Sequence, residues 1–163
     1  MPEYSFDVVS QYDPQELTNA LDQARREIAT RFDFKGTDPT IDRRGETLVI
    51  EASTEDRARA VYQVLVEKAA RRQLSAKLLK PGEPRTVGKG RGQIEVSLNA
   101  GISDDLARLL LKKARQVTPK IQVKVQGDQL RVSSKEKDAL QAVIKSLRED
   151  DSIPVPLQFV NRR

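Results

Sequence analysis

Apolar residues along this sequence recur with two periods, one typical of helices and one typical of strands. Four segments repeat apolar residues every three to four positions and are expected to be helices, with stripes over residues 17–28, 58–69, 106–117 and 139–147. Shorter segments that alternate or are bounded by Gly and Pro are expected to be strands, at residues 5–10, 40–43, 47–52, 74–80, 93–99, 120–126, 129–133 and 155–160. The segment FDFKGTDPT after Arg31 is expected to be a further strand with an irregular exit, which places Phe32 and Phe34 on one side.

Two glycine turns mark an internal repeat. GETLVIEASTEDRARAVYQVL, from Gly45, aligns without a gap on GDQLRVSSKEKDALQAVIKSL, from Gly127, at an offset of 82 (127 − 45). The preceding helices align at an offset of 90, so the first copy holds eight more residues between helix and hairpin. That extra length contains FDFKGTDP, which makes it the clearest difference between the copies.

The element order of each copy is βαββαβ. This order predicts an α+β protein of two tandem ferredoxin-like domains, each a four-stranded antiparallel sheet with two helices on one face. The expected ranges are 1–80 for the first domain, 81–92 for a basic Gly-rich linker and 93–163 for the second domain.

Composition excludes several classes of chemistry. The chain has no Cys and no His, which excludes disulfides, Ser-His and Cys-His catalysis and the usual zinc sites. No dense acidic motif is present for a Mg²⁺ site, so we expect a non-enzymatic protein without a metal or cofactor. Neither a signal peptide nor an apolar run of about 18 residues occurs, which predicts a cytoplasmic protein that does not enter a membrane.

The positive charge is concentrated toward the C-terminus. Residues 1–80 hold 13 Lys/Arg against 14 Asp/Glu, residues 81–92 hold 3 against 1, and residues 93–163 hold 13 against 9. The linker and the second half are therefore the parts expected to attract a polyanion.

Three sequence features suit an anionic ligand, and each has a simpler structural explanation. In FDFKGTDP, the rings of Phe32 and Phe34 beside Lys35 and Gly36 suit a nucleobase and its phosphate, although both rings could instead anchor a strand in the core. In the junction, Lys89 and Arg91 stand among glycines and could surround a phosphate, or the segment could be a flexible basic linker.

The third feature is a basic stripe on the helix after Ser103. It consists of Arg108, Lys112, Lys113 and Arg115, and Lys120, Lys124 and Arg131 on the following hairpin add to it. Such cations bind phosphates without reading sequence, but an ordinary solvated helix face has the same composition.

Longer motifs allow a comparison with a known family. SFDVVS, REIATRFDFKGT, KIQVKVQGDQLRVSS and PLQFVN closely resemble segments of the bacterial YajQ family, in the same order and over nearly the whole chain. The resemblance implies a pair of ferredoxin-like domains, with an exchange of the first strands between domains left open. It also implies a non-enzymatic protein that binds nucleotides. Members of the family are associated with purine nucleotides, with tRNA and, in some bacteria, with cyclic di-GMP linked to a transcription factor.

The family motifs indicate candidate nucleotide-binding positions. The first motif corresponds to Arg31, Phe32, Asp33, Phe34, Lys35 and Gly36, and the second to Gln126, Gly127, Asp128, Gln129 and Arg131. From these we expect a receptor for ATP, GTP or cyclic di-GMP that acts on a transcription factor. Arg31, Lys35, Lys124 and Arg131 would pair with phosphates, and Phe32 or Phe34 would support a base.

Other functions stay open at this point. The principal alternative is an RNA-binding protein, tRNA included, that uses the basic second half with Lys89 and Arg91. A protein-interaction adaptor that uses its exposed sheet faces and a metal-dependent phosphodiesterase are less favoured.

Overall fold

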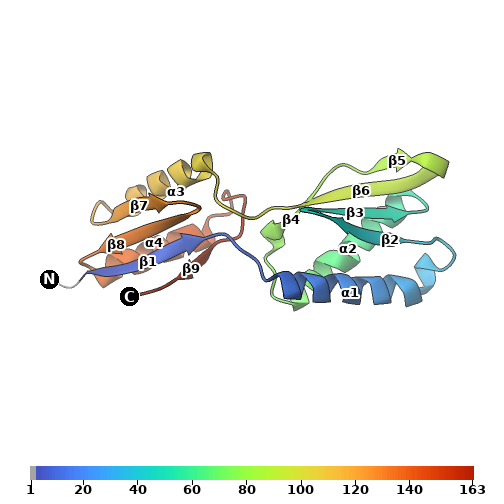
Figure 1. The fold of residues 1–163 in the computed structure, drawn as a ribbon, viewed down its shortest axis with the longest axis horizontal. Helices are drawn as coiled ribbons and strands as arrows, with labels where there is room; N and C mark the ends of the chain where they lie inside the picture. The colour runs from blue at the N-terminus through green and yellow to red at the C-terminus, as the bar shows by residue number, and fades with distance from the viewer. Residues whose placement is uncertain (1–2) are drawn as a thin grey trace. The chain divides into compact units, whose positions relative to one another are not determined.

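The computed structural model describes residues 3–163, so the first two residues of the expected first domain lie outside it. Within that range the chain is an α+β protein with four α-helices and two antiparallel sheets, one of four strands and one of five (Figure 1). It divides into two compact units. We call residues 12–99 the central unit, and residues 3–11 with 100–163 the terminal unit.

The central unit contains the longer sheet and two helices. Its elements are α1 (Pro14–Thr30), β2 (Thr40–Arg44), β3 (Thr47–Ala52), α2 (Glu55–Arg71), β4 (Leu79–Pro81), β5 (Arg85–Val87) and β6 (Arg91–Leu98). The strand order is β2-β3-β6-β4, and β5 also pairs with β6. Both helices begin at a side-chain N-cap, since the side chains of Asp13 and Thr54 accept hydrogen bonds from the N–H groups of Gln15 and Arg57.

The core of the central unit lies between its helices and one face of its sheet. Leu48, Ile50 and Ala52 alternate along β3 and are fully buried, as are Leu17 and Ala24 on α1. The stripes predicted for both helices therefore form the core. The close approach of β6 to α2 needs Gly92, where an added Cβ would lie 2.3 Å from the backbone at Thr54 and Glu55.

The terminal unit joins the two ends of the chain. It contains β1 (Tyr4–Val9), α3 (Asp104–Val117), β7 (Gln122–Gln126), β8 (Gln129–Ser134), α4 (Lys137–Glu149) and β9 (Gln158–Val160). The strand order is β7-β8-β1-β9, and the core lies between this sheet and the two helices, around Phe6, Leu110, Leu130 and Val143. Ser103 caps α3, since its hydroxyl accepts a hydrogen bond from the N–H of Leu106 at 3.2 Å.

The units do not follow the expected ranges 1–80, 81–92 and 93–163, because two strands exchange places. β1 pairs with β8 and β9 of the terminal unit, while β6 pairs with β3 and β4 of the central unit. The strand exchange left open by the family resemblance is therefore the observed pairing.

The segment 81–92 is not a plain linker. Arg85–Val87 forms β5, which pairs with β6 from Arg91 to Gln93, and a short 3₁₀ turn, η3 (Gly88–Gly90), joins the two strands. The chain crosses between units at residues 11–12 and 99–100 instead.

Among residues 3–163, no helix is long and apolar enough to cross a lipid bilayer.

Candidate functional site

The motif loop, residues 31–38, follows α1 and differs from the expected strand. Phe32–Phe34 forms a 3₁₀ turn, η1, closed by hydrogen bonds from the N–H of Phe34 to the carbonyl of Arg31 and from the N–H of Lys35 to that of Phe32. The two rings therefore do not share a side: Phe34 is 2% exposed and Phe32 is 89% exposed. The prediction that both point one way was wrong, because a turn of about three residues does not alternate its side chains as a strand does.

Several contacts hold this loop in one conformation. The hydroxyl of Thr37, a buried residue, donates to the carbonyl of Phe34 at 2.6 Å. The guanidinium of Arg91 donates to the carbonyl of Asp38 at 2.7 Å, so a residue of the basic junction anchors the far end of the loop. Gly36 has a φ of +78°, which glycine adopts without strain.

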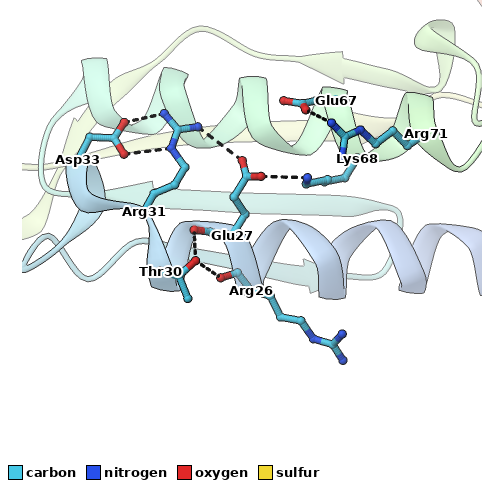
Figure 2. Close-up of polar contacts among 8 residues, drawn as sticks. All are labelled: Arg26, Glu27, Thr30, Arg31, Asp33, Glu67, Lys68 and Arg71. Atoms are coloured by element: carbon cyan, nitrogen blue, oxygen red, sulfur yellow. Dashed lines mark hydrogen bonds and ion pairs between the residues drawn. The ribbon is translucent and has the colours of Figure 1, made fainter.

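A network of charged side chains ties the loop to both helices (Figure 2). The guanidinium of Arg31 donates two hydrogen bonds to the carboxylate of Asp33, of 3.0 and 2.7 Å, and lies 3.5 Å from the carboxylate of Glu27. Glu27 in turn lies 2.9 Å from the ammonium of Lys68 on α2. The guanidinium of Arg31 also stacks over the ring of Phe34, 5.0 Å from its centre. Arg31 thus braces the turn that presents Phe32.

The protonation of this network follows from its contacts. The hydrogen bond from Lys68, aided by Arg31, holds the pKa of Glu27 below its ordinary value despite partial burial. The hydrogen bonds from Arg31 lower the pKa of Asp33, and the same contact raises the pKa of Arg31. Glu27, Asp33 and Arg31 are therefore charged at neutral pH.

A hollow of about 440 Å³ adjoins the loop. Lys35 and Gly36 line it together with Arg25 from α1, and Asp38 and Asp42 line it as well. The guanidinium of Arg25 already has a protein partner, because it donates two hydrogen bonds to the carbonyl of Ile41. The side chain of Lys35, by contrast, makes no hydrogen bond or ion pair with any residue of the described chain.

The second motif lies in the other unit, at the β7–β8 hairpin. Gln126 pairs with Gln129 across a turn that contains Asp128 and Gly127, whose φ is +62°. Lys124 and Arg131 are direct cross-strand partners, so the structure brings these two predicted cations side by side. The structure does not place them in one unit with Arg31, Phe32 and Lys35.

Arg131 has a structural partner. It donates to Asp7 of β1 at 3.1 Å, and the side chain of Asn161 donates to the same carboxylate at 2.8 Å. Asp7 is 1% exposed, and the hydrogen bond from Arg131 holds its pKa below the ordinary value against the opposing effect of burial. Arg131 therefore neutralises a buried charge, which limits its use as a phosphate ligand.

The remaining predicted cations differ in how they are engaged. Lys113 donates to Asp150 at 2.6 Å and to Ser152 at 3.1 Å, and its hydrogen bond is the main reason that the pKa of Asp150 falls to about 2. Arg108 lies 3.5 Å from Asp105 at an exposed position. Lys89, in η3, and Lys112, Arg115 and Lys124 make no side-chain hydrogen bond or ion pair within residues 3–163.

No group of three or more acidic residues among those described could hold a metal ion.

Comparison with known proteins covers both units. A family model described as "Nucleotide-binding protein YajQ-like" matches residues 4–163. A protein of Parafrankia sp. is 46% identical over 164 residues, and one of Mycobacterium avium is 47% identical over 165; each match spans 100% of both chains. A protein of Chloroflexus aurantiacus is 48% identical over 162 residues, which cover 99% of this chain and 98% of the relative.

The chain belongs to the YajQ-like family. The resemblance of its motifs is thereby confirmed at full length. The three bacterial relatives are each named a nucleotide-binding protein, and none of these names states an enzymatic activity.

One feature of this YajQ-like chain was not predicted: the groove between α1 and α2 that the charged network borders. Its lining includes Lys68, which is 8% exposed. A signal was present in the sequence, because Lys68 follows Val61 by seven residues and Leu65 by three and so falls within the buried stripe of α2. A charged residue in such a stripe indicates a buried partner, here Glu27.

Proposed function

We propose that this YajQ-like chain binds a nucleotide at the motif loop of the central unit, with Phe32 stacking on the base and Lys35 contacting phosphate. The observation that carries the proposal is the contrast between the two rings. Phe34 is buried and fixes the turn, whereas Phe32 is 89% exposed on a turn braced by Arg31, Thr37 and Arg91.

The energetics favour a ligand on Phe32. A phenylalanine left in water forgoes about 1.5–3 kcal/mol that burial would provide. Stacking a base on an exposed aromatic ring is worth about 1–3 kcal/mol. Since the turn is already fixed by its own contacts, binding does not have to order it.

The proposed ligand is a purine nucleotide or cyclic di-GMP, and the chain would act as a receptor that passes the signal to a transcription partner. The nucleotide-binding names of the relatives and the RFDFKGT motif support this choice. Of the cations predicted to pair with phosphates, Lys35 is the one near Phe32 whose side chain has no protein partner in the described structure. Arg31 serves as a positioning residue.

Calorimetric titration with ATP, GTP and cyclic di-GMP tests the proposal. At least one is expected to bind at micromolar protein concentration. Phe32→Ala should weaken the binding of that nucleotide by about 1–3 kcal/mol, which is the contribution of one base stack. The variant should keep the stability of the wild-type protein. Val125→Ala removes another exposed apolar side chain, 49% exposed on β7, and should leave binding unchanged. Absence of heat with all three nucleotides would refute the proposal.

RNA binding by the terminal unit is a second candidate, supported by the unengaged cations Lys112, Arg115 and Lys124. The net charge supports RNA binding less than the charge distribution along the sequence predicted. After strand exchange the terminal unit holds 13 Lys/Arg against 10 Asp/Glu, and the central unit holds 16 against 14. The net charges of +3 and +2 barely differ. An RNA complex through this unit should weaken steeply with added salt and show little sequence preference.

We also propose that each unit is a ferredoxin-like domain completed by the first strand of the other repeat. The strand orders β7-β8-β1-β9 and β2-β3-β6-β4 support this, since β1 and β6 hold equivalent central positions. A fragment of residues 12–99 that folds alone would agree with the proposed unit, whereas residues 1–80 would lack the central strand.

A further inference from the structure

The groove between α1 and α2 of the central unit is unlike the loop hollow in both charge and size. Its volume is about 860 Å³. Its lining carries four cations, Arg26, Lys68, Arg71 and Arg72, against two carboxylates, Glu16 and Glu27. The net charge of the lining favours an anion.

The buried ammonium of Lys68 is the strongest indication of a ligand. Lys68 is 8% exposed and has one partner in the described residues, Glu27 at 2.9 Å (Figure 2). An ammonium has three N–H donors, and one of them is directed at Glu27. Because Lys68 lines the groove, an anionic oxygen there can accept from the other donors and add a second negative partner to this cation.

The three arginines of the groove are only weakly engaged. Arg26 makes no side-chain hydrogen bond or ion pair with the rest of the described chain, and its guanidinium extends away from the Glu27–Lys68 pair in Figure 2. Arg72 lies 3.8 Å from Glu16, and Arg71 pairs with Glu67 at a largely exposed position. An exposed pair such as Arg71–Glu67 contributes about 0–1 kcal/mol, and the Arg72–Glu16 pair is half-buried but long, so an anion can displace both at small cost.

The size of the groove and the number of its cations point to more than one anionic group. Four cations line a volume of about 860 Å³, which is much more than one phosphoryl group fills. A short chain of phosphoryl groups would fill more of this volume and contact more of the cations. We propose that the α1–α2 groove is a second ligand site that binds a compact polyanion with two or more phosphoryl groups, through Lys68, Arg26 and Arg72. This site needs no base and is independent of the function proposed for the motif loop.

Calorimetry with sodium tripolyphosphate at low salt tests the inference on the full chain. Wild-type protein should bind, and the affinity should fall with added salt. Arg26→Ala and Arg72→Ala should each weaken binding by about tenfold, as expected for a lost charge-assisted hydrogen bond. Both side chains lie at the surface of the helices, so these variants should retain the wild-type unfolding midpoint.

Two further variants locate the site. Arg59→Ala removes one positive charge from α2 outside the groove, where Arg59 pairs with Asp56, and should leave tripolyphosphate affinity within about twofold. Phe32→Ala should also leave it unchanged, even if it abolishes nucleotide binding. No binding to wild type overturns the inference, and so does equal weakening by Arg59→Ala and Arg26→Ala. Loss of binding in Phe32→Ala would assign the polyanion to the motif loop instead.

Discussion

Replacing Arg131 by Met separates a structural role from a ligand-binding role for this residue of the family motif. The variant keeps the aliphatic stem of the side chain and removes its charge. Asp7, 1% exposed, would then retain only the hydrogen bond from Asn161. Breaking a fully buried ion pair by removing one partner costs about 3–5 kcal/mol. The side chain of Arg131 is 38% exposed and Asn161 still donates to Asp7, so the expected loss is smaller, about 2 kcal/mol.

Urea denaturation followed by NMR signals of β1 and β8 measures this loss in the terminal unit. Lys124→Met is the matched control, because Lys124 faces Arg131 across the strands but makes no ion pair within residues 3–163, and should cost under about 0.5 kcal/mol. Adding Asp7→Asn to Arg131→Met should restore part of the stability, since no buried charge then lacks its partner.

The contribution of the Asp7–Arg131 pair to stability should depend on pH in one direction. Arg131 lowers the pKa of Asp7 in the folded state, so the pair stabilises the protein above the unfolded pKa of about 3.9. That contribution is lost as the pH falls through the lower folded pKa, and the gap between wild type and Arg131→Met should close there. A loss below about 1 kcal/mol at neutral pH, or a gap that does not change with pH, would refute the structural role.

Three more outcomes follow from the packing and the charges. Gly92→Ala should destabilise the central unit by at least about 2 kcal/mol in urea, because the new Cβ meets backbone at 2.3 Å, whereas Gly88→Ala, with open space around the Cβ, should be close to neutral. Phe34→Ala should cost about 3–5 kcal/mol in the same assay, as expected for a buried ring; a near-neutral result would contradict its anchoring role. In an NMR titration, Asp150 should have a pKa of about 2, and Lys113→Met should raise it toward the ordinary value; an unchanged pKa would show that their hydrogen bond is not formed in solution.

Local structure was largely predictable because its causes lie within a few residues. Asp13 and Ser103 make the hydrogen bonds typical of N-cap residues, and the glycines at the two hairpins, Gly45 and Gly127, adopt φ values of +63° and +62°. These features depend on side chains and backbone positions that are adjacent in sequence.

The pairing of β1 could not be predicted from its own residues. β1 and β6 occupy equivalent central positions in the two sheets, so the alternation SFDVVS suits either sheet equally well. Only the family resemblance raised the exchange. Long-range strand pairing depends on partners more than a hundred residues away, such as Asp7 with Arg131, and no local pattern encodes it.

The candidate site was predictable as a location but not as a geometry. The sequence placed an aromatic and cationic insertion after the first helix, and the structure shows a loop there. The sequence could not show that Phe34 is buried and Phe32 exposed. That difference depends on a 3₁₀ turn stabilised by the hydrogen bonds between Arg31 and Asp33 and by Arg91 from β6.

The central claim is that a nucleotide binds at the motif loop on Phe32. Amide and aromatic NMR shifts, recorded while titrating in the nucleotide that gives the largest calorimetric heat, test it most directly. The account predicts that the largest changes fall on residues 31–37, with the ring protons of Phe32 shifted by stacking on the base. Largest changes on the β7–β8 hairpin, with residues 31–37 unaffected, would contradict it.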